Sequence, residues 1–160
     1  MNAGWAIVTP QAGWQGWLAD EGTMAAVDGT TWVAGLGAVS ANGAGTSVRV
    51  IELDHTLTAG GTSDTAPVIP AQSSVIGVTA RVLTTISGSA AAWRLGVAGS
   101  DDRYGTGLGL AAGSWARGLT GTPLAYYSDT PLRLSGEGGD FSDGTVRLAV
   151  HVMKLALPRI

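Results

Sequence analysis

Cysteine is absent from this sequence of 160 residues, and lysine occurs once, at Lys154. Without cysteine, the chain can form no disulfide scaffold, no thiolate zinc site and no cysteine nucleophile. The arginines are scattered, and the twelve acidic residues outnumber the nine basic ones. Proteins that bind nucleic acid use clustered cations to neutralise phosphates, so we expect no direct contact with nucleic acid.

Long apolar runs are also missing. No apolar segment is long enough to cross a bilayer. The first residues show no basic segment followed by an apolar one, which is the pattern of an export signal. We therefore expect neither membrane insertion nor a cleaved leader.

Charged residues make up only 13% of the chain, against about 25% in an average soluble domain. A lone monomer would have too few charges to cover its surface. We therefore expect a homo-oligomer, a trimer in preference to a pentamer, in which the copies cover one another's apolar surface.

Alternating apolar and polar residues give the clearest structural signal, between Val75 and Gly99. The apolar side of the first strand predicted there consists of Ile76, Val78, Ala80, Val82 and Ile86. After a break at 87–89, Trp93 to Val97 repeat the alternation, which predicts the second strand of a hairpin with Trp93 in the core.

Further strands are expected near 48–57, 108–110, 125–134 and 145–157, with a turn at 140–144. No segment has a helical period. These features predict an all-β fold, with an antiparallel, jelly-roll-like β-sandwich over residues 48–160.

Residues 1–33 are rich in tryptophan and predict a small β-meander with tight turns at Asp20-Glu21-Gly22 and Asp28-Gly29-Thr30. Residues 34–47 are glycine, alanine and serine with little else, which is typical of a linker or extended arm. Trp14 and Trp17 are three residues apart and so point to opposite faces of a strand, which leaves at least one for another chain. The alternative is a tiny core made from Trp5, Trp17 and Trp32.

No catalytic motif is present. The sequence has no G-x-S-x-G nucleophile turn, no paired histidines for zinc and no phosphate-binding loop. His55 and His151 are expected at polar or hydrogen-bonded core positions, and the aspartates of 101–102 and 140–143 as solvated loop acids. We therefore expect no enzyme activity, no metal and no cofactor.

A glycine-dense section at 100–118 predicts loops, and it mixes aromatic, cationic and acidic residues. Sugar rings stack on aromatic faces while their hydroxyls bind charged groups, so this mixture fits a carbohydrate site. The predicted carbohydrate-binding residues are Asp101, Asp102, Arg103, Tyr104, Trp115 and Arg117. The alternative is that Tyr104 and Trp115 fill the ends of the sandwich or a subunit interface.

Two stretches resemble known families. Residues 48–157, with VIPAQSSVIGVTARVLTTISG and AAWRLGVAGSDDRYGTGLGL, resemble the distal domain of phage tail-fibre and phage-like spike proteins. The segment PQAGWQGWLADEGTMAAVDGTTWV resembles a repeat found in alphaproteobacterial prophages and gene transfer agents, where similar proteins are head spikes or fibres that contact the capsule of the recipient cell.

The resemblance implies a structural component on the surface of a virus-like particle. Its sandwich would bind host capsular polysaccharide as an oligomer, and Trp14 and Trp17 would attach it to capsid, spike or fibre proteins of the same particle. The alternative is a spike base or adaptor that anchors a fibre without binding glycan itself.

Overall fold

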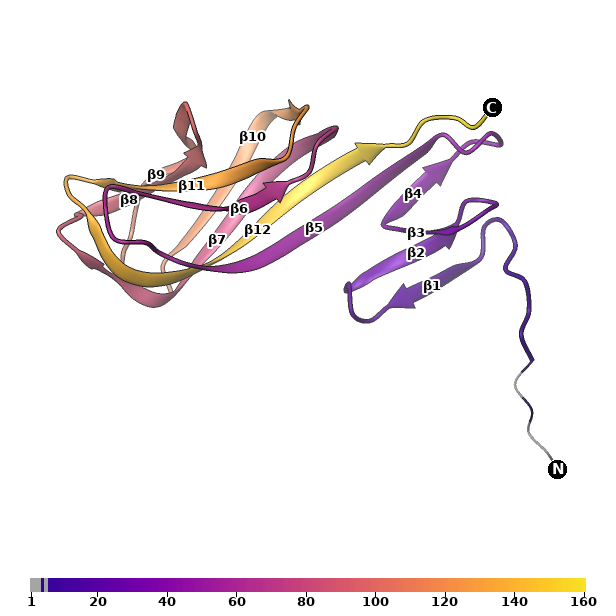
Figure 1. The fold of residues 1–160 in the computed structure, drawn as a ribbon, viewed down its shortest axis with the longest axis horizontal. Helices are drawn as coiled ribbons and strands as arrows, with labels where there is room; N and C mark the ends of the chain where they lie inside the picture. Colours follow the sequence, from indigo (N-terminus) through magenta and orange to yellow (C-terminus); the bar gives the residue numbers. More distant parts are fainter. Residues whose placement is uncertain (1–3, 5) are drawn as a thin grey trace. The chain divides into compact units, whose positions relative to one another are not determined.

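A computed structural model describes residues 4 and 6–160 (Figure 1), and all regular elements there are β-strands. The strands are β1 Gln15–Leu18, β2 Thr23–Val27, β3 Trp32–Ala34, β4 Leu36–Val39, β5 Gly45–Thr56, β6 Thr62–Ile69, β7 Ser73–Gly88, β8 Ala92–Val97, β9 Ser100–Leu108, β10 Trp115–Tyr126, β11 Thr130–Glu137 and β12 Phe141–Leu155. The part of the chain described here holds no helix that could span a membrane.

The chain divides into two compact units. Unit 1 contains the described residues up to Arg49 together with Leu155–Ile160, and unit 2 contains Val50–Lys154. The long strands β5 and β12 each begin in one unit and end in the other.

Unit 2 is a sandwich of two sheets. One sheet has the order β10-β7-β12-β5, and the other has the order β6-β11-β8-β9 (Figure 1). β7 runs antiparallel to β10 and β12, and β11 antiparallel to β6 and β8. Eight strands in this order form a jelly roll, so the predicted fold class is confirmed.

The core of the sandwich follows from alternation along its longest strands. Val78, Ala80 and Val82 of β7 are buried, whereas Thr79 and Arg81 between them reach the surface. The largest side chain in the core is Trp93 of β8, which is completely buried and donates its indole N–H to the carbonyl of Gly109 at 3.0 Å. Trp93 is therefore a core residue, as its sequence pattern predicts.

The predicted hairpin between 75–86 and 93–97 is wrong, because β7 and β8 lie in different sheets. The short connection crosses from one sheet to the other, and Ser89 and Ala90 both donate their N–H groups to the carbonyl of Asp140. Two strands that bury their apolar sides in one core show the same alternation whether they pair or face each other. Ile76 is also exposed, since a register shift in the β12–β7 pair puts Val75 inward instead.

The glycine-dense section at 100–118 forms strands β9 and β10 and not mainly loops, which corrects the prediction. Glycine allows close backbone approach here: a β-carbon on Gly96 would collide with the carbonyl oxygen of Ser100, and one on Gly118 with that of Tyr104. The predicted turn at 140–144 also shifts. β12 already begins at Phe141, and Gly138, in the left-handed region, precedes it.

Unit 1 contains the predicted three-stranded meander, with order β1-β2-β3. Gly22 and Gly29 have positive φ in the two predicted turns. Residues 34–47 are no linker, however, because they hold β4 and the start of β5, which pair with each other. Alanine and glycine suit this pairing since Gly45 is buried against Leu36 and Ala156.

Small side chains form the interior of unit 1. Ala25 and Val27 are buried, whereas Trp17 and Trp32 remain largely exposed, so these tryptophans do not make a tiny core. Trp5, the third member of that predicted core, lies outside the described residues.

The C-terminal residues complete unit 1. The guanidinium of Arg159 donates to the carboxylate of Asp28 at 3.0 Å and to the hydroxyl of Thr30 at 2.8 Å. N–H groups of Thr31 and Thr30 hold the pKa of Asp28 well below its usual value, with a smaller effect from Arg159. The carboxylate therefore stays ionised and holds both its own turn and the end of the chain.

Candidate functional site

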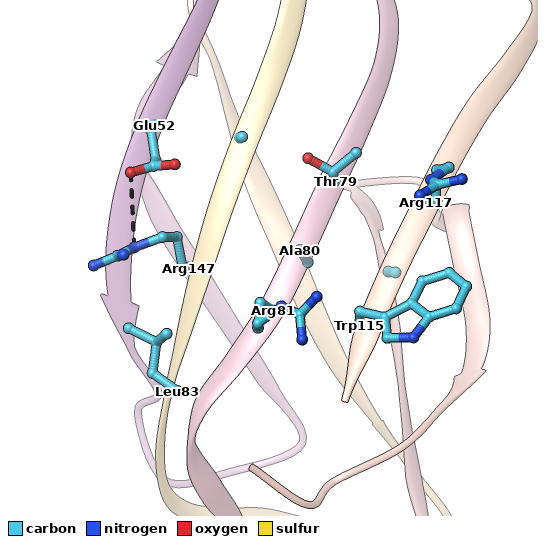
Figure 2. Close-up of a pocket in the computed structure, with 10 residues that line it drawn as sticks. Glu52, Thr79, Ala80, Arg81, Leu83, Trp115, Arg117 and Arg147 are labelled. Carbon is cyan, nitrogen blue, oxygen red and sulfur yellow. Dashed lines mark ion pairs between the residues drawn. The ribbon is translucent and has the colours of Figure 1, made fainter. Parts of the chain in front are cut away.

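A shallow, open depression of about 490 Å³ lies on the outer face of the sheet β10-β7-β12-β5 (Figure 2). Most of its lining residues face outward from four neighbouring strands, because alternate positions of each strand point away from the core. Ala80 and Ala116 are the buried exceptions. The lining residues are Glu52, Thr79, Ala80, Arg81, Leu83, Trp115, Ala116, Arg117, Arg147 and Ala149. The site therefore rests on a rigid sheet and not on loops.

Trp115 and Arg117 form one wall of the depression. They are two positions apart on β10, and the Arg117 guanidinium carbon is 5.7 Å from the centre of the indole ring. At this distance the cation is attracted to the ring face. Trp115 is nevertheless 60% exposed, so much of its indole surface remains free for a ligand.

Arg81 lies in the middle of the site. Its backbone pairs with Trp115 of β10 on one side and with Arg147 of β12 on the other, and Figure 2 shows its side chain between theirs. Arg81 donates one hydrogen bond, at 3.1 Å, to the carbonyl of Gly113. Among the described residues, neither Arg81 nor Arg117 forms an ion pair with a carboxylate.

The two acidic residues beside the depression, Glu52 and Asp54, both pair with Arg147. Arg147 binds Asp54 through two hydrogen bonds, of 2.6 and 2.7 Å, and its Nε lies 3.7 Å from Glu52. The hydrogen bond from Arg147 lowers the pKa of Asp54, which keeps this carboxylate charged. Two arginines beside an exposed tryptophan are left without a counter-ion, and this combination is suited to an anionic ligand with an apolar face.

Of the six predicted carbohydrate-binding residues, the structure brings only Trp115 and Arg117 together in this site. Asp101 lies on the other sheet, where its carboxylate is 3.3 Å from Arg94 of β8. Asp102 follows it on β9 and does not line this depression. The prediction placed all six in one loop cluster, whereas strand pairing distributes them over both sheets.

Tyr104 is buried between the sheets, so it cannot contact a ligand from solvent. Its hydroxyl lies 2.7 Å from that of Tyr126, which also accepts a hydrogen bond of 3.0 Å from Arg103. Burial is the main reason why the pKa of Tyr104 is raised, and the bond to Tyr126 adds to it. The alternative interpretation, in which an aromatic fills the sandwich, is thus correct for Tyr104. Trp115 does not fill the sandwich, and its place in a subunit interface stays a prediction.

Metal-binding clusters of three or more His, Asp or Glu side chains do not occur among the described residues. Both histidines lie near hydroxyl groups: the Nε2 atom of His55 is 2.8 Å from the Ser63 hydroxyl, and that of His151 is 3.3 Å from the Thr79 hydroxyl. Each therefore has a hydrogen-bonding partner that fits the predicted polar role.

Sequence reasoning missed Arg81, Thr79, Arg147 and Glu52 as members of the site. Alternation indicates that Thr79 and Arg81 face outward, but it does not reveal that β7 lies between β10 and β12. That arrangement joins segments far apart in the sequence, and only the sheet order places Arg81 beside Trp115.

The predicted attachment residues lie in unit 1. Trp17 is exposed and pairs with Met24 across β1 and β2, and Met24 is exposed as well. Trp14 precedes β1, accepts a hydrogen bond from the N–H of Val27 and is also exposed. The structure thus leaves both tryptophans accessible, and their role in attachment stays a prediction.

Comparisons with known proteins identify no family. No family model matches the sequence, and no curated protein matches it. Among solved structures, this chain is similar to one described as "Cyanophage Pam1 capsid asymmetric unit", with 22% sequence identity, coverage of 73% of this chain and 90% of that chain, and a TM-score of 0.43. The function is therefore inferred from the site itself.

Proposed function

We propose that this protein is a non-enzymatic structural component of a phage-like particle that binds polysaccharide on the host cell surface. The proposed binding site is the depression around Trp115 on the outer face of unit 2. The observation that carries it is an exposed indole on a sheet, next to two arginines that have no acidic partner among the described residues.

An open sheet face suits a polymer better than a small molecule. A depression that is open at its sides can hold a few sugar rings while the rest of the polysaccharide extends beyond it. One such site would bind weakly. In a homo-oligomer, a trimer or a pentamer, several copies can hold one polysaccharide, which raises the effective affinity by about 10²–10⁴ when the geometry allows it.

Trp115→Ala should abolish most of the retention on polysaccharide. Because indole stacking supplies the apolar part of the contact, we expect affinity to fall about tenfold or more per site. The measurement is retention of the purified oligomer on a panel of immobilised bacterial capsular polysaccharides. Tyr104→Phe is the matched control, since it changes a buried aromatic hydroxyl outside the site. Equal retention of wild type and Trp115→Ala would contradict the proposal.

Attachment to the particle is assigned to the exposed tryptophans of unit 1. Trp17 and Met24 form an apolar cross-strand pair, and such pairs on a surface are typical of protein interfaces. This pair also favours the second candidate function, a spike base or adaptor that joins particle proteins without binding glycan.

Trp14→Ser and Trp17→Ser should release the protein from assembled particles, because each removes an exposed aromatic anchor and leaves the small core of Ala25 and Val27 intact. The measurement is the amount of protein that sediments with purified particles. Trp115→Ala serves as the control and should still sediment. If Trp115→Ala alone is lost from the particles, the depression is an assembly contact and the adaptor function replaces glycan binding.

A further inference from the structure

From the charges around Trp115, we infer that the polysaccharide bound by unit 2 is acidic and that Arg81 and Arg117 bind its carboxylates. This inference rests on the proposed function, and it adds the chemical class of the ligand. It concerns Arg81, a residue for which the sequence gives no signal of binding.

The first argument is the uneven distribution of counter-ions. Arg147 has two acidic partners on β5, whereas the described residues provide none for Arg81 or Arg117. The protein as a whole is negatively charged, at -3, so acidic side chains are available to the fold. Arg81 and Arg117 therefore form a positively charged area on the outer face of the sheet, next to the exposed indole of Trp115.

The second argument comes from the register of the sheet. Arg81 lies directly opposite Arg147 on the neighbouring strand. Like charges at directly opposite positions destabilise a sheet. Arg81 has no acidic partner among the described residues and donates only to the carbonyl of Gly113. A charge that opposes folding in this way is expected mainly at functional sites. Arg81 is therefore better explained by a ligand than by the fold.

The third argument is geometric. Arg81 is opposite Trp115, and Arg117 is opposite Thr79, so the two arginines are diagonal neighbours on adjacent strands. Diagonal positions are about 7–8 Å apart at the backbone, and two long side chains span this distance easily. Guanidinium groups bind carboxylates through paired hydrogen bonds. A uronic-acid ring stacked on Trp115 would present its carboxylate to one arginine and that of a neighbouring ring to the other.

The experiment compares acidic polysaccharides with their own neutral derivatives. The probes are polygalacturonate, alginate and hyaluronan, each as the native polymer and after chemical reduction of its carboxyl groups, with dextran as the neutral reference. We expect the wild-type oligomer to bind at least one native polymer, carboxyl reduction to weaken this binding about tenfold or more, and added salt to weaken it as well.

Two variants locate the effect. Arg81→Gln and Arg117→Gln should each reduce binding of the acidic polymer about tenfold and leave binding of its reduced form unchanged. Lys154→Gln is the matched control, because it removes one positive charge from an exposed position of β12 outside the depression. Arg81→Gln should also leave the melting temperature unchanged or raise it, whereas loss of a purely structural arginine would lower it.

The outcomes separate this inference from the proposed function. Binding that depends on Trp115 but is equal for native and reduced polymers would overturn the acidic ligand and leave glycan binding in place. Binding of none of the polysaccharides would overturn both. Equal competition by duplex DNA of matched charge would also overturn the inference, because the arginines would then recognise any polyanion.

Discussion

Trp93→Ala is expected to unfold unit 2 under conditions in which the wild type is stable. The indole is completely buried between the two sheets and donates a hydrogen bond to Gly109. Truncation of a buried tryptophan costs about 3–5 kcal/mol, because the side chain loses its burial and leaves a cavity. Since a domain of this size has a total stability of about 5–15 kcal/mol, this single change removes a large part of it.

The matched control is Trp115→Ala, which removes the same side chain from an exposed position in the same unit. It loses little buried surface and a contact with Arg117 of about 0.5–1 kcal/mol. The measurement is urea unfolding of both variants, followed by far-UV circular dichroism. Similar losses of stability in the two variants would show that Trp115 is packed inside an interface and not free for a ligand.

This contrast between two tryptophans shows what alternation can predict. Trp93 shares its side of a strand with Leu95 and Val97, and all three are buried, as the pattern indicates. The all-β class and the turns of unit 1 follow from equally local signals. The pairing of strands does not follow from local signals. β7 and β8 both have an apolar side and yet belong to different sheets. Which strands become neighbours depends on packing across the whole domain.

Only part of the candidate site can be predicted from the sequence, because sheet partners are not encoded locally. Trp115 and Arg117 are close in sequence and lie together on β10, whereas Arg81 is brought to them by the β10–β7 pairing. The glycines around Tyr104 in the sequence predict a loop there. The structure instead places Tyr104 in β9, and Gly118 of β10 lets the two strands approach closely. In a sequence, a glycine that permits close packing cannot be told from one that makes a loop flexible.

Gly118→Ala is expected to open the edge at which the two sheets meet. A β-carbon on Gly118 would lie 2.6 Å from the Cα atom of Tyr104 and still closer to its carbonyl oxygen. Backbone atoms on both sides have little freedom to move, so β9 or β10 must shift. Overpacking of this kind costs about 1–3 kcal/mol, and Gly118→Val should cost more.

The control for Gly118→Ala lies three residues further along β10. Gly121 has no heavy atom within 4 Å of the β-carbon position, so Gly121→Ala should leave stability nearly unchanged.

Ultraviolet titration of tyrosine provides a local readout, because burial between the sheets raises the pKa of Tyr104. If β9 and β10 separate, water reaches the phenol and its pKa should fall toward the ordinary value in Gly118→Ala but not in Gly121→Ala. A Gly118→Ala protein with wild-type stability and an unchanged tyrosine titration would show that this edge of the sandwich is not tightly packed. Since Arg117 precedes Gly118 on the same strand, a shift of β10 should also weaken glycan binding, which connects the packing of the core to the geometry of the outer face.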